Sequence, residues 1–261
     1  MTELWLAIYQ AFAFPVGTAV GVAIVGILYV VENEWGNHRW VKLIRSTNMA
    51  CWTIGLTAVA CVIGGLLPAD TAFQTSIPFV VLLVALMVNL TLTVFHRLRS
   101  FKMRRDWTFM AIHVGLWLAL FSGLVGAGDS KRLNVIVSSE EETNLAYDEN
   151  YRTASLPYSL RLKEFEIETN VADGSPVQYS AMVLVDGEPV EIAVNSPHSL
   201  SLSEDMYLMN FRSTREDGEV NICMLTIERQ PWKYPMLAGL SLLLIGAVAR
   251  LKDLKIKGLK N

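Results

Sequence analysis

The side chain best placed for chemistry in this sequence is a histidine inside an apolar run. His113 is the seventh residue of an uncharged segment over residues 107–127, about 9 Å along a helix from the start of that run. An ionisable side chain at that depth in a membrane is costly, and such residues usually face a helix-bundle interior, a cavity or a cofactor. Two interpretations therefore stand side by side for His113: a structural, hydrogen-bonded residue and a functional ligand.

The other three histidines are weaker candidates for a chemical role. His96 lies at the end of an apolar run beside Arg97, where an interfacial residue needs no special role. His38 and His198 fall in segments that we predict to be surface loops. The three cysteines form no CxxC pair, and the sequence contains no nucleotide-binding glycine loop, HExxH or GxSxG motif. These absences disfavour a thioredoxin-type dithiol and the enzyme classes that those motifs mark.

Long apolar runs must position these residues. Of the 261 residues 52% are hydrophobic and 18% are charged, below the roughly 25% charged of soluble domains. Five uncharged runs cover residues 11–31, 49–67, 77–95, 107–127 and 234–249. A helix of about 20 residues spans the hydrocarbon core of a bilayer, which is about 30 Å thick. The sequence predicts about five transmembrane helices, the first of which Phe14-Pro15 could shorten.

Charges divide the chain into two parts. Residues 129–233 carry nineteen acidic and nine basic side chains, whereas the rest of the chain carries six acidic and thirteen basic ones. These thirteen fall between the first and second runs, between the third and fourth, and after the fifth. Because basic loops stay in the cytoplasm, we expect residues 128–233 outside and the C-terminus inside. Basic residues in short loops beside apolar runs do not indicate a nucleic-acid partner.

The acidic segment is predicted to form strands. Apolar residues alternate or cluster over residues 161–168, 182–185, 190–194, 207–211 and 220–227, and the alternation slips at Lys163-Glu164, which predicts a bulge. Asp186-Gly187 and Glu216-Asp217-Gly218 are turn signals between strands. The predicted fold is a membrane α-helical bundle of about five transmembrane helices plus a small all-β extracytoplasmic domain.

The order of these features resembles the ResB family of cytochrome c biogenesis proteins (System II). His113-Val-Gly115 occupies the place of the family's His-Leu-Gly motif, and Asn89-Leu90 that of its Asn-Leu pair. The most specific piece is the segment 156–168, LPYSLRLKEFEIE, which is similar to the family's Leu-Pro-Phe-x-Leu-x-Leu-x-Asp-Phe-x-Ile segment. The resemblance begins near residue 50 and continues in collinear order through the last apolar run. One span precedes it.

The resemblance completes the predicted domain organisation. Residues 1–48 are expected to hold an extra N-terminal span and a cytoplasmic loop, and residues 49–127 a three-span membrane core. Residues 128–233 are expected to form the extracytoplasmic β-rich domain, shorter than in many members, and residues 234–261 the last span and a basic cytoplasmic tail. The implied location is the bacterial inner (plasma) membrane, with the outer domain facing the periplasm or the exterior.

The resemblance implies that this chain handles haem. With a partner, family members move haem across the membrane and support its attachment to exported apocytochrome c. By resemblance His113 would ligate the iron of a transiently bound b-type haem. His96 is the second choice within the chain, and a further axial ligand would come from the partner or a substrate.

The resemblance also implies a partner. The chain lacks the tryptophan-rich WWD segment that marks the ResC/CcsA-type subunit. It would therefore be the non-WWD half of a cytochrome c haem lyase and not catalytic alone. The alternative is a scaffold whose outer β domain docks apocytochrome or the partner without ligating haem, in which case His113 is structural.

Overall fold

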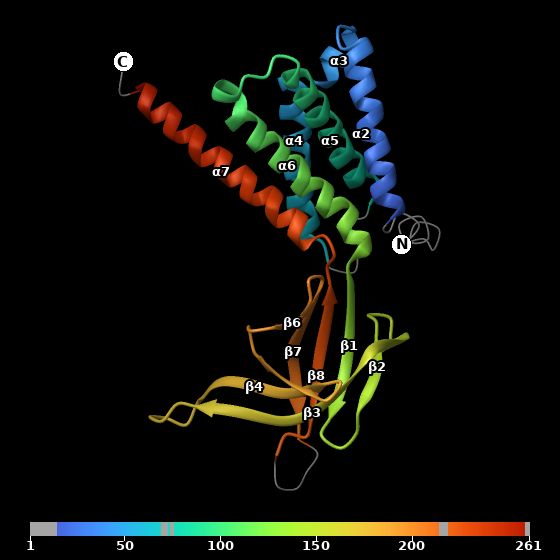
Figure 1. Cartoon of the computed structure of the whole chain (residues 1–261), viewed down its shortest axis with the longest axis vertical. Coiled ribbons are helices and arrows are strands. Elements are labelled where there is room, and N and C mark those ends of the chain that lie inside the picture. Colours follow the sequence, from blue (N-terminus) through green and yellow to red (C-terminus); the bar gives the residue numbers. More distant parts are fainter. Residues whose placement is uncertain (1–14, 69–72, 74–75, 214–218, 259–261) are drawn as a thin grey trace. The chain divides into compact units, whose positions relative to one another are not determined.

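The computed structural model divides the chain into two compact units, each described here by itself. The helical unit comprises Met1–Asp129 and Trp232–Asn261, and the sheet unit comprises Ser130–Pro231. The structure describes residues 15–68, 73, 76–213 and 219–258, with the side chains of residues 104, 127 and 253–258 excepted. The predicted class of helices plus a β domain is confirmed: the one unit consists of long apolar helices and the other of an antiparallel sheet (Figure 1).

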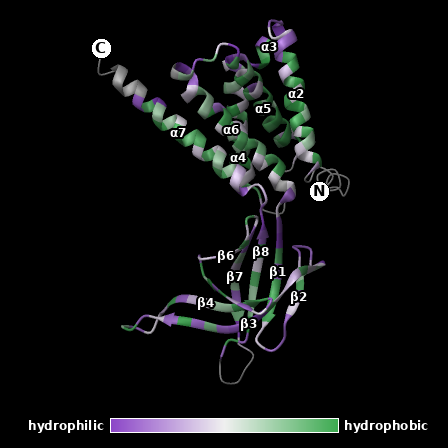
Figure 2. Cartoon of the chain, viewed as in Figure 1, coloured by the Kyte–Doolittle hydropathy of each residue, from purple (hydrophilic) through white to green (hydrophobic). Residues whose placement is uncertain are grey.

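Five helices in the described part of the chain are long and apolar enough to cross a membrane. They are α2 (Val16–Trp35), α4 (Thr47–Leu66), α5 (Ile77–Leu98), α6 (Met103–Asp129) and α7 (Lys233–Gly258), with the short α3 (Arg39–Ile44) between the first two. Figure 2 shows the apolar residues concentrated along these helices. Residues 11–14 of the first predicted run lie outside the described residues. The described part of that run forms α2, which begins directly after Pro15, a residue that lacks the amide donor a helix interior needs.

Helix α5 is the centre of the helical unit. It packs against α2, α4 and α6, and α6 packs along the length of α7 (Figure 1). Asn89 of α5 is 2% exposed and donates from Nδ2 to the carbonyl oxygens of Ile44 (2.5 Å) and Ser46 (3.3 Å), which ties α5 to the turn between α3 and α4. This buried amide thus joins α5 to the segment between α3 and α4.

Glycines set the close approach of α6 and α7. A Cβ on Gly115 would lie 2.5 Å from the backbone nitrogen of Leu243 and 2.7 Å from the backbone oxygen of Gly239. A Cβ on Gly239 would lie 2.7 Å from the backbone nitrogen of Ala119. Small residues let helix backbones approach this closely, and in a membrane such contacts replace the hydrophobic effect as the source of helix association.

The sheet unit is one eight-stranded antiparallel sheet in the order β5-β4-β3-β2-β1-β8-β7-β6. Its strands are β1 (Lys131–Ser138), β2 (Thr143–Tyr147), β3 (Thr153–Thr169), β4 (Pro176–Val185), β5 (Glu188–Ala193), β6 (His198–Ser201), β7 (Glu204–Arg212) and β8 (Ile222–Arg229). The sheet curls, so that β5 at one edge contacts β6 and β7 at the other. One buried core, which includes Val137, Leu160, Ile192, Met206 and Leu225, fills the interior.

Some strand predictions are confirmed and others are wrong. The pairing of β3 with β4 shifts register between Leu162 and Glu164, the predicted bulge. Asp186 and Gly187 have positive φ of 49° and 85° in the tight β4–β5 turn, as hairpin turns of this kind require. Residues 214–218, which include the whole of the second predicted turn, lie outside the described residues. His198 does not lie in a loop: it begins β6, opposite Met206.

Candidate functional site

His113 lies on α6 and is held by the preceding turn of its own helix. Its Nδ1 is 2.8 Å from the carbonyl oxygen of Phe109, and its ring stacks on the Phe109 ring with centroids 3.8 Å apart. Because a carbonyl oxygen only accepts, Nδ1 carries the proton, and in a neutral imidazole the lone pair then lies on Nε2. The side chain is half-buried. The contacts thus orient the ring and leave Nε2, with its lone pair, outside this bond.

The Phe109 ring connects His113 to a buried carboxylate. The guanidinium carbon of Arg97 lies 5.6 Å from the centroid of that ring, within the range of a cation–π contact. Arg97 also donates to Oδ1 of Asp106 at 2.5 Å, and Arg105 donates to the same oxygen at 2.9 Å. The Asp106 side chain is fully buried, and its Oδ2 accepts from the backbone amide of Lys102 at 2.9 Å. This carboxylate fixes the turn from which α6 begins.

A second buried carboxylate holds His96. Oε1 of Glu32 lies 2.5 Å from Nη1 of Arg45, 3.0 Å from Nδ1 of His96 and 3.9 Å from Nη1 of Arg99. Glu32 is 1% exposed, whereas the His96 side chain is 53% exposed. Arg99 donates further to the backbone oxygen of Glu32 and to Oδ1 of Asn33. We name Glu32, Arg45, His96 and Arg99 the Glu32 cluster.

The two predicted site histidines therefore belong to different surroundings. His113 is bonded within α6, and His96 of α5 is bonded to α2, the helix ahead of the predicted three-span core. Sequence reasoning missed Glu32 and Asp106, which lie just outside the predicted apolar runs. A signal was available: the part of the chain outside residues 129–233 has only six acidic residues, and these two adjoin basic loops. Such isolated acids beside arginines are candidates for buried ion pairs.

The described residues hold no group of three or more His, Cys, Asp or Glu side chains that could bind a metal ion. A ligand set in this part of the chain would therefore consist of single residues, as in axial ligation of a haem, where the porphyrin supplies the other donors. The donor chemistry of His113 fits that role. Among the described residues no such set is found for a structural zinc ion, which needs four side-chain ligands.

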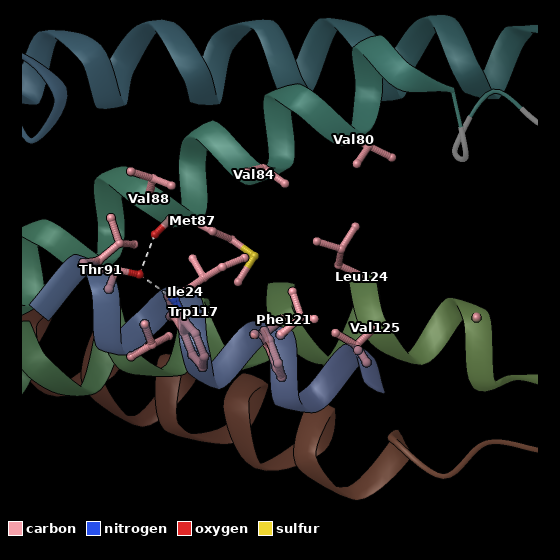
Figure 3. A pocket seen from close by; sticks show the side chains of 16 residues that line it. Ile24, Val80, Val84, Met87, Val88, Thr91, Trp117, Phe121, Leu124 and Val125 are labelled. Atoms are coloured by element: carbon pink, nitrogen blue, oxygen red, sulfur yellow. Dashed lines mark hydrogen bonds between the residues drawn. The ribbon is translucent and has the colours of Figure 1, made fainter. Parts of the chain in front are cut away.

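The helical unit also contains an apolar cavity of about 340 Å³ between α2, α5 and α6. Figure 3 shows Ile24 from α2, Val84 and Met87 from α5, and Trp117 and Phe121 from α6 around it. Neither His113 nor His96 lines it. The predicted ligand residues and this apolar cavity are thus separate features of this unit.

The family-like segment 156–168 lies in β3, and packing explains its apolar positions. Leu156, Leu160 and Leu162 are 6%, 0% and 2% exposed and belong to the core of the sheet. Burial, with a smaller contribution from the carboxylate of Glu204, raises the pKa of Tyr158 to about 12. Burial alone raises the pKa of the Cys223 thiol to about 12. Both groups stay protonated at neutral pH, which is the behaviour of core residues.

A comparison with family models agrees with the sequence resemblance. The model of the ResB-like family matches residues 102–239, which contain all of α6, all eight strands and the start of α7. Among solved structures, the cytochrome c haem lyase CcmF is similar at 11% sequence identity with a TM-score of 0.38, over 75% of this chain and 33% of that chain. The chain thus spans about a third of the length of that structure. No curated protein matches in sequence.

Proposed function

This chain belongs to the ResB-like family, and from that premise we propose that it is the membrane subunit of a complex that exports haem and attaches it to apocytochrome c. Membership supports the role in cytochrome c biogenesis. The proposal adds that the chain binds b-type haem transiently and does so together with a ResC/CcsA-type partner that carries the WWD motif. It does not require that this chain be catalytic alone.

The five long apolar helices, together with the family, indicate a membrane protein. We place it in the bacterial inner membrane, with α2, α4, α5, α6 and α7 as spans. The basic residues support the orientation, because they gather around α3, between α5 and α6, and at the end of α7. In this orientation the sheet unit faces the periplasm and the C-terminus faces the cytoplasm.

The observation that carries haem binding is the fixed tautomer of His113. The bond to the Phe109 carbonyl leaves Nε2 of the neutral ring with its lone pair, as an axial haem ligand needs. A second-sphere bond of this kind also orients the ring and raises the basicity of the ligand. The half-buried ring supports a site shared with a second subunit, because part of it is open at the surface of the unit. Haem bound there supplies the iron and the vinyl groups; the chain positions it.

His96 is the runner-up ligand. Its Nδ1 faces a carboxylate, and a carboxylate behind a histidine is a common support of metal-ligating rings. Glu32 is also occupied by two arginines, however, so the same contact serves as an ion-pair network that joins α2 to α5. His113, by contrast, is held from its own helix, by the bond to the Phe109 carbonyl and by stacking on the Phe109 ring.

The test is a haem spectrum of the complex. The chain is co-expressed with a ResC/CcsA-type subunit and purified, and haem content and the Soret band are recorded for His113→Ala. Because His38 is exposed at the N-cap position of α3 and its side chain makes no capping hydrogen bond, His38→Ala is the matched control. We expect loss or a shift of the haem signal in His113→Ala alone. An unchanged spectrum in that variant overturns the ligand assignment.

The scaffold alternative is favoured by one observation, the independent core of the sheet unit. If deletion of residues 130–231 abolishes the complex while haem stays with the helices, the sheet unit is the docking part. If in addition His113→Ala retains haem, the scaffold function replaces the proposed one. The two measurements therefore separate docking from ligation.

A further inference from the structure

The walls of the apolar cavity come from three helices: the consecutive helices α5 and α6, and α2, which α3 and α4 separate from them in sequence. Its lining comes from α2 (including Gly21 and Ile24), α5 (including Val84) and α6 (including Phe121). At about 340 Å³ it exceeds twice the roughly 150 Å³ of an apolar protein cavity that takes up benzene. A space of this size without occupant forfeits dispersion contacts along all three walls. The cavity is therefore large enough to hold a ligand and costly to leave empty.

The polar atoms of the lining side chains already have partners. Thr91 donates to the carbonyl oxygen of Met87 at 2.7 Å, and the indole nitrogen of Trp117 donates to the Thr91 hydroxyl at 2.9 Å (Figure 3). No charged residue lines the cavity. A ligand with a polar head inside the cavity would lose its hydrogen bonds to water without replacement, which is strongly unfavourable. The occupant must be apolar along the part that enters.

The cavity is a consequence of how α2 is attached. Its C-terminal end is fastened by the Glu32 cluster and by Tyr29, whose ring meets that of Phe95 at 5.3 Å. Farther towards its N-terminus α2 approaches α6 at Gly21, where an added Cβ would overlap the Phe121 ring. Around this point α2 lines the cavity with Gly17, Val20, Gly21 and Ile24, and the space between these residues and α5 stays unfilled.

The walls of the cavity continue into the exposed surface of the helical unit. Val20, Ile24 and Val84 line the cavity and are at the same time 36%, 43% and 41% exposed. Their neighbours Val22 and Val81, which do not line it, are 65% and 58% exposed. The mouth is thus bordered by apolar side chains, and in the proposed membrane placement it opens to lipid tails.

We infer that one acyl chain of a bilayer lipid occupies this cavity and completes the packing of α2 against α5 and α6. A flexible, unbranched hydrocarbon suits a narrow space with satisfied polar atoms and an apolar mouth. Haem does not suit it: Met87 offers the one metal-binding side chain among the lining residues, and no basic residue there could pair with propionates. The inference rests on the proposed membrane placement and not on haem binding.

The test uses Trp117, whose ring lines the cavity, as the reporter. The full chain is reconstituted into phosphatidylcholine vesicles with or without bromine on the middle of the acyl chains, since bromine quenches tryptophan fluorescence on contact. The part due to Trp117 is the difference from Trp117→Phe. Val84→Phe fills the cavity, and Val81→Phe is its control: the same change on the same helix, exposed but outside the lining.

We expect bromolipid to quench the Trp117 signal in the parent protein and in Val81→Phe, and this quenching to be lost in Val84→Phe. A phospholipid retained on the parent and Val81→Phe but not on Val84→Phe in native mass spectrometry would agree. Equal quenching of Trp117 in all three proteins, or haem or a second copy of the chain recovered in the cavity, overturns the inference. If bromolipid quenches no tryptophan at all, the membrane placement itself is wrong.

Discussion

The close approach of α6 and α7 predicts that replacing Gly115 by alanine destabilises the helical unit. In Gly115→Ala the new methyl group would lie 2.5 Å from the backbone nitrogen of Leu243. Nonbonded atoms of this kind prefer about 3.5 Å, so α7 must retreat by about 1 Å or the backbone must bend. Backbone atoms cannot rotate away as a side chain can. Overpacking of this kind costs about 1–3 kcal/mol.

Gly123→Ala on the same helix is the matched control, because a Cβ at Gly123 meets no atom within 4 Å. Alanine is favoured over glycine in a helix interior by about 1 kcal/mol, and this gain is common to both variants. The stability difference between them is therefore the overpacking cost alone, about 1–3 kcal/mol, with Gly115→Ala the less stable.

The assay is unfolding in mixed micelles by increasing fractions of sodium dodecyl sulfate, followed by helical circular dichroism, to which the sheet unit contributes little. We expect Gly123→Ala to unfold at or above the midpoint of the parent protein and Gly115→Ala below it. Equal midpoints for the two alanine variants would refute the close approach of α6 and α7.

Two further predictions concern buried ionisable groups. Glu32→Gln should lower the free energy of unfolding by about 1–3 kcal/mol. This is less than the roughly 3–5 kcal/mol of a fully buried ion pair, because His96 and Arg99 are about half exposed and regain water. The control Glu34→Gln, at an exposed position of α2, should leave the free energy of unfolding unchanged in the same micelle assay. In the sheet unit the raised pKa values of Cys223 and Tyr158, both about 12, mean that the folded state holds protons that the unfolded state releases from about pH 9 upward. Stability should thus be full below pH 9 and fall towards pH 12, by up to about 1.4 kcal/mol per pH unit and group. Denaturant unfolding at several pH values checks this, and Cys223→Val should remove the part of the slope that begins at pH 9.

The helices could be predicted because their signal is long and local. The run predicted over residues 77–95 is the helix Ile77–Leu98, and that predicted over 107–127 is Met103–Asp129. The helices extend past the apolar runs because backbone hydrogen bonding does not stop where hydropathy does. Arginines at the ends can keep their charges at the interface while the helix continues. Hydropathy marks the apolar stretch and not the end of the helix.

The strands were harder because their signal is short and depends on partners. We predicted a strand over residues 161–168, whereas β3 begins at Thr153. Pro157 argues against a strand in sequence, yet it lies where the β2–β3 register shifts, so no ladder hydrogen bond is lost there. The strand β1 was missed, since its first residues are charged; it is identified by pairing with β8, about ninety residues later in the chain. The residue pattern within β1 alone does not reveal that it pairs with β8.

The site shows the same division between local and distant information. Depth in an apolar run identified His113, and its bond to Phe109 lies within one helical turn. The partner of His96 is 64 residues away on α2, so no local rule connects the two. Glu32 directly follows the predicted run 11–31, yet it is almost completely buried within the observed α2.

The contacts of Glu32 make the two imidazoles separable by experiment. If His96 ligated haem iron, Glu32 would stand behind the ligand, and Glu32→Gln would weaken the donor and shift the haem spectrum. If His113 is the ligand, the same change loosens α2 but leaves the Phe109 bond intact, so the spectrum stays while stability falls. If His113 is the ligand, this chain supplies one of the two axial positions of the haem iron. The second axial ligand must then come from the partner or from the incoming cytochrome. The extra N-terminal span would in that case serve the packing of the helical unit, with its carboxylate at one end and the apolar cavity at the other, and not the chemistry of haem.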